Sequence, residues 1–128
     1  MSHDIQRIDT NPRLSGCVLH NGLVYVSGQV PTNLDADAKQ QTLEVLAQID
    51  ALLEQSGSDK SRILTAQIWI KNIAEDFAVF NECWEAWLPD GAAPARAAIQ
   101  ADLARPQVLV EVMVTASIKY TYEKSPCF

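Results

Sequence analysis

The sequence is poor in the residues that build metal centres, disulfide frameworks and phosphate-binding loops. Its 128 residues include two histidines, three cysteines and five glycines. An odd number of widely spaced cysteines predicts neither a disulfide framework nor a zinc site. No glycine-rich phosphate loop is present. Cys83 falls between Phe80 and Trp84 in a helical stretch. We therefore expect its thiol to be buried in the core rather than to act as a nucleophile. We also expect no bound metal.

Basic residues are also scarce, with 10 Lys and Arg against 16 Asp and Glu and a formal net charge of −6. Nucleic-acid binding draws most of its affinity from Lys and Arg, so this scattered set argues against a nucleic-acid partner. No apolar run approaches the length of a membrane span, and the first seven residues lack the hydrophobic region of a signal peptide. We therefore expect a cytoplasmic protein with no membrane partner.

The chain has the length and the 48% hydrophobic content of one globular domain. Asn21-Gly22, between two short apolar runs, is a strong hairpin signal. The predicted order is strand, hairpin, helix, strand, helix, strand, strand, which makes an α+β layer domain with two helices against a mostly antiparallel or mixed sheet. The strands are expected at 5–9, 17–20, 23–29, 63–71 and around Arg96 and Glu111, and the helices at 38–55 and 75–87.

Each predicted helix carries an apolar stripe. In the first, Asp37 is a plausible N-cap and Gly57 lies where a C′ glycine belongs. The expected buried residues are Leu43, Leu46, Ile49 and Leu53 in the first helix, and Phe77, Phe80, Trp84 and Trp87 in the second. Asn81 shares the apolar face of the second helix. A polar amide there marks either a functional residue or a specific buried hydrogen bond.

The segment Pro94–Gln100 carries one arginine among small residues. On a strand Arg96, Ala98 and Gln100 share one face, and no bulky neighbour crowds the guanidinium group. A planar fork with free space around it is suited to bidentate binding of a carboxylate. Arg96 is therefore a candidate for holding a small anion.

Fifteen positions later an acidic residue interrupts the apolar segment Val108–Val114. Leu109, Glu111 and Met113 are expected to share one strand face. A carboxyl group in apolar surroundings is suited to proton transfer near neutral pH. The residues themselves leave open a second interpretation, in which Arg96 and Glu111 form a structural ion pair.

Several ordered motifs together resemble the Rid family (reactive intermediate deaminase), also called YjgF, from about Ile5 to Ile118. The matching pieces are Val26–Pro31, the Gln41-Thr42…Gly57 helix, Asp76–Asn81, Pro94–Arg96 and Val110–Val112. The Asn33–Ala38 loop and the spacing of Trp84 and Trp87 are more similar to the YoaB-like branch than to RidA. The tail 119–128 has no predicted role in the core, so the chain is expected to be a single Rid-like domain.

The resemblance implies a fold like that of bacterial chorismate mutase, with a six-stranded sheet covered on one face by two helices. It also implies a homotrimer with clefts between subunits that hydrolyses imine and enamine acids such as 2-aminoacrylate to a 2-keto acid and ammonia, without a cofactor. By resemblance, Arg96 holds the substrate carboxylate and Glu111 activates water. Asn81 and Ser27 line the cleft, Gly28 gives it room, and Ala98 contributes backbone groups.

Two positions depart from the RidA pattern. Where those members have Gly-Pro-Tyr ahead of the hairpin, this chain has Pro12-Arg13-Leu14, so a cleft tyrosine is replaced by leucine. Where they have Cys or Thr, this chain has Ala98. The alternative to an enzyme is a non-catalytic module that holds a small carboxylate in the same cleft, and Leu14 favours it slightly.

Overall fold

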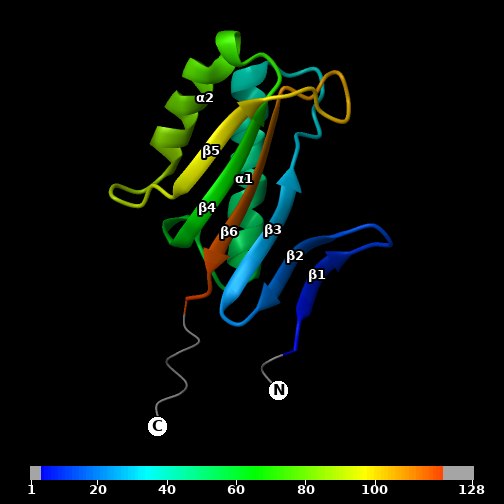
Figure 1. Ribbon diagram of the computed structural model, residues 1–128, viewed down its shortest axis with the longest axis vertical. Helices are drawn as coiled ribbons and strands as arrows, with labels where there is room; N and C mark the ends of the chain where they lie inside the picture. Colours follow the sequence, from blue (N-terminus) through cyan, green and yellow to red (C-terminus); the bar gives the residue numbers. More distant parts are fainter. Residues whose placement is uncertain (1–3, 120–128) are drawn as a thin grey trace.

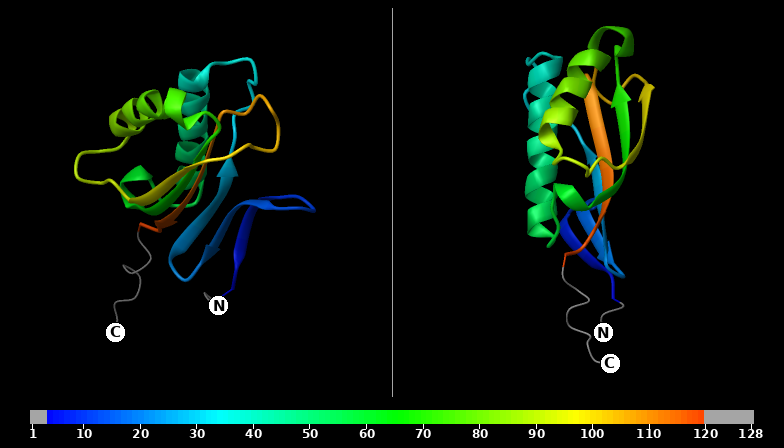
Figure 2. Two further views of the ribbon diagram at one scale, coloured as in Figure 1. Left: turned by 45° about the horizontal axis from the view of Figure 1, so that its top comes forward. Right: turned by 90° about the vertical axis from the view of Figure 1, so that its left-hand side faces the viewer.

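The computed structural model describes residues 4–119, which form two helices packed on one face of a six-stranded sheet (Figures 1 and 2). The strand order is β1-β2-β3-β6-β4-β5. The β4–β5 pair is parallel, and every other pair is antiparallel. The elements are β1 (Gln6–Thr10), β2 (Ser15–His20), β3 (Leu23–Gln29), α1 (Ala38–Gln55), the 3-10 turn η1 (Lys60–Arg62), β4 (Ile63–Ile70), α2 (Ile73–Trp87), β5 (Ala95–Gln100) and β6 (Val110–Ser117).

The predicted α+β class, the mixed and mostly antiparallel sheet and the placement of both helices on one face are confirmed. Helix α2 begins two residues before the predicted start, because the Gln100 side chain accepts a hydrogen bond from the Ile73 N–H at 3.0 Å and extends its first turn. Of the predicted tail 119–128, only Lys119 lies within the described residues. Neither helix in residues 4–119 is long and apolar enough to cross a membrane.

The hairpin between β2 and β3 turns at Asn21 and Gly22, as the sequence predicts. Both residues have positive φ, 53° and 80°, and His20 pairs with Leu23 across the turn. Two consecutive left-handed residues form the type I′ geometry that matches the twist of the flanking strands. This hairpin brings β3 back beside β2 and leaves its other edge to pair with β6.

The hydrophobic core lies between the sheet and the helices. Alternate residues of the central strands are buried there, among them Val26 of β3, Ile68 of β4 and Val112 of β6. Cys83 lies in this cluster, so its predicted place in the core is confirmed. Desolvation by burial raises the pKa of the Cys83 thiol above its usual value, which disfavours the nucleophilic thiolate.

The prediction that Leu43 is buried is wrong, because 43% of this residue is exposed. The buried residues of α1 are Ala38, Gln41, Thr42, Val45, Leu46, Ile49 and Leu53. Each helical residue is turned by about 100° from the one before it, so Leu43 is rotated away from the face that Thr42 presents to the sheet. The polar side chains of Gln41 and Thr42 occupy positions that a purely apolar stripe would not assign to them.

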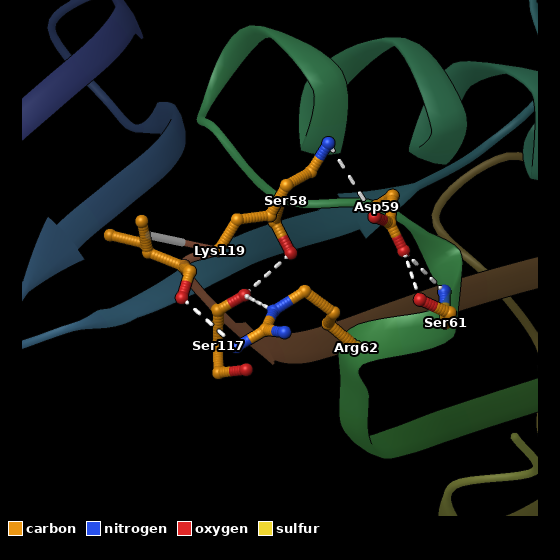
Figure 3. A network of polar contacts seen from close by, with 7 residues as sticks. Ser58, Asp59, Ser61, Arg62, Ser117 and Lys119 are labelled. Atoms are coloured by element: carbon orange, nitrogen blue, oxygen red, sulfur yellow. Dashed lines mark hydrogen bonds and ion pairs between the residues drawn. The ribbon is translucent and has the colours of Figure 1, made fainter. Parts of the chain in front are cut away.

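A polar cluster holds the end of β6 against the turn that follows α1 (Figure 3). Ser58, which is 1% exposed, donates its hydroxyl to the Ser117 carbonyl at 2.7 Å. The Arg62 guanidinium donates to the carbonyls of Ser117 and Ile118 at 3.2 and 3.1 Å. These contacts satisfy backbone oxygens at the point where β6 leaves the sheet.

We predict that Ser58→Ala lowers the free energy of unfolding by about 1–3 kcal/mol. The substitution removes one of the two side-chain donors to the Ser117 carbonyl, the other being Arg62. Chemical denaturation of wild type and variant measures the difference. Ser61→Ala serves as a control, because Ser61 is an exposed residue of the neighbouring turn. Equal losses in the two variants would show that the buried hydrogen bond has no special weight.

Candidate functional site

Arg96 lies on β5, at one edge of the sheet (Figure 1). In the parallel β4–β5 pair, Arg96 is opposite Ala66 and Ala98 is opposite Ile68. Both β4 residues are buried beneath the helices, so Arg96 and Ala98 belong to the helix-covered face of the sheet. The predicted common face for Arg96, Ala98 and Gln100 is confirmed, since Gln100 is opposite the buried Ile70.

The Arg96 guanidinium reaches the second helix. Its Nη2 donates to the Asn81 Oδ1 at 2.8 Å, and its central carbon lies 5.7 Å from the ring centres of both Phe77 and Trp84. The two rings and the amide orient the planar fork, while the residue as a whole stays exposed. Asn81 therefore breaks the apolar pattern of α2 because it orients an arginine.

Phe77 and Trp84 were predicted only as core residues, and their contact with Arg96 was missed. The available signal was their spacing, since Phe77 lies four residues before Asn81 and Trp84 three residues after it. Residues at these spacings share one side of a helix. A guanidinium group that is hydrogen-bonded to Asn81 therefore also lies near both rings.

Beside Arg96 the surface forms an open hollow of about 380 Å³. Asn81 and Arg96 line one part of it, and Trp84 and Leu88 contribute apolar surface. This volume lies within the range of about 300–1,000 Å³ typical of small-molecule sites. Glu85 and Asp90 also line the hollow, so the one cationic fork would hold a small acid beside apolar surface and two carboxylates.

Glu111 lies on β6 opposite Trp69 of β4. Its strand neighbours Val110 and Val112 are buried under the helices, so Glu111 belongs to the open face of the sheet. Met113 shares that face, as predicted, and is 43% exposed. Leu109 instead precedes β6 and packs against the core cluster, where the chain has not yet entered the strand alternation.

The Glu111 carboxyl group is half-buried, and desolvation raises its pKa above the ordinary value for glutamate. Within residues 4–119 it forms neither an ion pair nor a side-chain hydrogen bond. A group with a raised pKa and no fixed partner can exchange a proton more readily near neutral pH. These are the properties that a general acid or base requires.

Gly28 makes room for this carboxyl group. A methyl group built on Gly28 would lie 2.1 Å from the Glu111 Oε2, so no side chain fits while Glu111 keeps its position. The β3–β6 register shifts between Val26 and Gln29, which places Ser27 and Gly28 in a bulge. Ser27 is half-buried there, and its carbonyl accepts a hydrogen bond from the Gln29 amide at 3.1 Å.

We predict that Gly28→Ala displaces the Glu111 carboxylate with little effect on the fold. The atom in the way is the far end of a flexible side chain, which can rotate at a cost of about 0.5–1.5 kcal/mol. The crystal structure of the variant should show the carboxylate moved, and any activity that depends on Glu111 should fall. Gly22→Ala is an unsuitable control because Gly22 has positive φ; Ala97→Gly, at the exposed edge strand, is preferable. An unmoved carboxylate would contradict the contact.

The two candidate groups lie on opposite faces of the sheet in one protomer. Arg96 belongs to the helix-covered face and Glu111 to the open face, with β4 between their strands. Arg96 therefore bonds to Asn81 rather than to Glu111. The structure brings Arg96 together with Asn81, and Gly28 together with Glu111, but it leaves these two half-sites apart and excludes the structural ion pair within a protomer.

Leu14, which replaces the cleft tyrosine of the resemblance, lies in the turn between β1 and β2 and is 53% exposed. This turn joins the two strands farthest from β5 in the sheet order. Along the sheet Leu14 is thus remote from Arg96, whereas β2, which follows it, is the neighbour of β3, the strand that carries Gly28. Within residues 4–119 no three His, Cys, Asp or Glu side chains lie close enough together to hold a metal ion.

Comparison with known proteins gives a consistent result over nearly the whole chain. The sequence model of one family, described as Endoribonuclease L-PSP, matches residues 4–118. The chain is 48% identical over 114 residues to the RutC family protein YoaB of Escherichia coli, a match that covers 89% of this chain and 98% of the relative. A RutC family protein of Haemophilus ducreyi is 46% identical over 116 residues, 91% of this chain and 98% of the relative.

Solved structures agree with these matches. A YjgF family member from Neisseria meningitidis is 44% identical, superposes with a TM-score of 0.89, and is matched over 93% of this chain and 98% of that chain. A protein of unknown function from the Rid family of Yersinia pestis is 31% identical with a TM-score of 0.81, over 90% of this chain and all of that chain. The similarity confirms the predicted family resemblance and the fold that it implies.

Proposed function

We propose a function on one premise, that this chain belongs to the YjgF family, also called Rid and described as Endoribonuclease L-PSP. The proposed activity is hydrolytic deamination of small imine and enamine acids to 2-keto acids and ammonia. The observation that carries it is the pair of half-sites: an oriented guanidinium beside an open hollow, and a desolvated carboxyl group against a glycine. One can hold an acid, and the other can move a proton.

Arg96 would bind the carboxylate of the substrate. Within residues 4–119 the guanidinium has an amide and two aromatic partners but no carboxylate, so its charge is available to a ligand. A bidentate pair fixes both the position and the plane of the carboxylate. The adjacent imine carbon then has a defined position, which lowers the entropic cost of the attack.

Glu111 would serve as the proton carrier. Its carboxylate takes a proton from water as the water oxygen bonds to the imine carbon, and the C=N bond becomes a C–N single bond. The protonated carboxyl group gives that proton to the nitrogen, which yields an amino alcohol. The carboxylate then takes the hydroxyl proton and passes it to the amino nitrogen, so that the C=O bond forms as the C–N bond breaks and ammonia leaves. An enamine acid reacts as its imine tautomer. The imine carbon is already electrophilic, so positioned water and one acid–base group suffice without a covalent nucleophile.

The half-sites complete each other only if a second copy of the chain supplies the missing one. We propose a homotrimer in which Arg96 and Asn81 of one subunit face Ser27, Gly28 and Glu111 of the next. The open face of the sheet supports this assembly, because Tyr25 and Met113 expose 42% and 43% of their surface there. Backbone groups near Ala98 would border the same cleft.

We predict that the purified protein is a trimer at micromolar concentration, as measured by light scattering or native mass spectrometry. Met113→Lys should weaken the assembly, because it places a charge on the apolar open face. Leu43→Lys is the matched control, since Leu43 is equally exposed but lies on α1. A wild-type monomer would contradict the shared site and, with it, the proposed mechanism.

The alternative is a module that binds a small carboxylate without turnover. A relative from Lactococcus lactis, which is 33% identical over 114 residues, carries the name of a regulator, AldR. Leu14 in place of tyrosine supports the same view. The deciding assay measures keto acid and ammonia released from freshly generated imines of several amino acids by wild type and Arg96→Ala. Binding of 2-ketobutyrate without any turnover would favour the module.

This chain gives little support to the ribonuclease activity that the family description names. Its net charge is −6, and its ten Lys and Arg form no continuous run in the sequence. Phosphate contacts by Lys and Arg supply most of the affinity for RNA and DNA. We accordingly propose a small acid as the ligand and no nucleic-acid or membrane partner.

A further inference from the structure

One buried polar side chain of α1 ties together two loops that lead into the candidate site. Gln41 is fully buried. Its Nε2 donates to the carbonyls of Ala36 and Gln107 at 3.1 and 3.0 Å, and its Oε1 accepts from the Leu109 N–H at 2.8 Å. Both amide hydrogens and one oxygen lone pair are thus used. The Gln107 and Leu109 contacts hold the chain just before β6, two residues from Glu111.

The same helix also holds the chain that follows the bulge. The Glu44 carboxylate accepts hydrogen bonds from the backbone N–H groups of Thr32 and Asn33 at 2.7 and 3.3 Å. The Gln48 amide donates to the Val30 carbonyl at 3.1 Å, two residues beyond Gly28. Gln41, Glu44 and Gln48 therefore fix the β3 and β6 segments on either side of the Gly28–Glu111 contact.

That contact depends on the relative position of two strands. Glu111 packs where a side chain on Gly28 would clash, so a small movement of either strand changes how much water reaches the carboxylate. The ladder between β3 and β6 is interrupted at the bulge, between Val26 and Gln29. The backbone hydrogen bonds between β3 and β6 therefore restrain the two strands less there than elsewhere. The side chains of α1 supply the remaining restraint.

We propose that Gln41 is a positioning residue for Glu111: by holding Gln107 and Leu109 it fixes the start of β6 against the bulge at Gly28, with Glu44 giving the matching restraint on the β3 side. The inference rests on the proposed function for its effect on turnover. Its structural content, the position and solvation of the Glu111 carboxyl group, can be measured without any substrate.

The surroundings of Glu111 support an effect through solvation. From β4 it faces Trp69, and from β3 it faces the bulge at Gly28. Lys71 follows β4, but its ammonium group donates to the Pro106 carbonyl at 2.7 Å. No charged group of the described residues contributes to the raised pKa of Glu111, whose cause is desolvation by burial. In the proposed trimer the neighbouring subunit would bring its Arg96 guanidinium toward Glu111, and Glu85 and Asp90 line the hollow beside that arginine.

If Gln41 only satisfies loop backbone groups, its loss should lower stability and leave Glu111 unchanged. If it positions Glu111, its loss should also admit water and bring the pKa of Glu111 down toward the ordinary glutamate value. The acid limb of the pH–rate profile should then move to lower pH. Turnover should fall by roughly tenfold to a hundredfold, the effect expected of a small misplacement.

The experiment uses the full chain in its native assembly. Gln41→Met keeps the length of the side chain and removes all three hydrogen bonds. Glu44→Gln is a milder substitution, three residues further along α1. Ser58→Ala is the control, because it removes a buried hydrogen bond at the far end of β6. For each variant we would measure the melting temperature, the titration of the Glu111 carboxyl carbon by NMR, and the pH–rate profile.

The expected result is a lower titration midpoint of Glu111 in Gln41→Met and in Glu44→Gln, with no change in Ser58→Ala despite its lower melting temperature. An unchanged midpoint in a folded Gln41→Met protein overturns the proposal. Should Gln41→Met fail to fold, an unchanged midpoint in Glu44→Gln overturns it instead. A shifted midpoint in a protein that hydrolyses no imine supports the positioning role and refutes the proposed function, so the two failures are distinguishable.

Discussion

Glu111→Gln should lower the rate of imine hydrolysis by roughly 10²–10⁴-fold, the usual contribution of a positioned acid–base group. Glutamine keeps the volume of the side chain and its place beside Gly28 but cannot exchange a proton. Binding of small carboxylates should persist, because Arg96 supplies the charged contact with the acid and is itself held by Asn81. Single-turnover hydrolysis and calorimetry with 2-ketobutyrate measure the two effects separately.

The stability of this variant should respond to pH in a defined direction. The pKa of Glu111 is raised in the folded protein, so the carboxyl group contributes most to stability when it is protonated. That contribution is present below the unfolded-state pKa and is lost as the pH rises through the folded-state pKa. Glu111→Gln should therefore be at least as stable as wild type near pH 7, with its relative advantage disappearing under acidic conditions.

Glu54→Gln is the matched control, since it makes the same chemical change at an exposed position of α1. It should alter neither turnover nor the pH dependence of unfolding. Unchanged turnover in Glu111→Gln, together with a large loss of stability at neutral pH, would remove Glu111 from the mechanism. A structural role with an unidentified cationic partner would then explain the residue better.

Arg96→Ala should weaken the binding of small carboxylates by about 2–5 kcal/mol, or roughly 30- to 5,000-fold. The substitution removes a charge-assisted fork that lies beside the hollow at Asn81. The protein should remain folded, because Arg96 is exposed and forms no ion pair within residues 4–119. Calorimetry with 2-ketobutyrate and a thermal melt provide the two readouts.

Two further variants show which property of the arginine matters. Arg96→Lys keeps the charge but loses the planar fork, so its affinity should fall between those of wild type and Arg96→Ala. Arg105→Ala removes an exposed arginine from the loop before β6 and should bind as wild type does. Equal affinity in wild type and Arg96→Ala would show that Arg96 does not hold the acid.

Local signals predicted most of the fold. Asn21-Gly22 specified the hairpin because both positions require left-handed backbone. The position of Asp37 indicated a helix cap, and its side chain does cap α1 by accepting a hydrogen bond from the Gln40 N–H at 2.9 Å. The error at Leu43 arose because a leucine at helical spacing also suits a groove between helices. Leu43 lines the hollow between α1 and α2 rather than the interface with the sheet.

The candidate site was harder to predict because it depends on distances between strands, which the alternation of residues along one strand does not specify. Strand periodicity placed Arg96 and Glu111 on defined faces of their own strands, but only the sheet order and register show that these faces are opposite. Gln41 belonged to a motif that carried the family resemblance, but nothing in the sequence predicted its buried contacts. Its partners at Gln107 and Leu109 lie 66 and 68 residues away in the sequence.

The most direct test of the shared site mixes two inactive variants. Arg96→Ala and Glu111→Gln subunits, unfolded and refolded together in equal amounts, should regain about a quarter of wild-type imine hydrolysis, because one in four random neighbour pairs joins an intact Arg96 to an intact Glu111. Each variant refolded alone should stay inactive. Mixed trimers, verified by native mass spectrometry, that hydrolyse imines no faster than the separate variants would contradict a site shared between subunits.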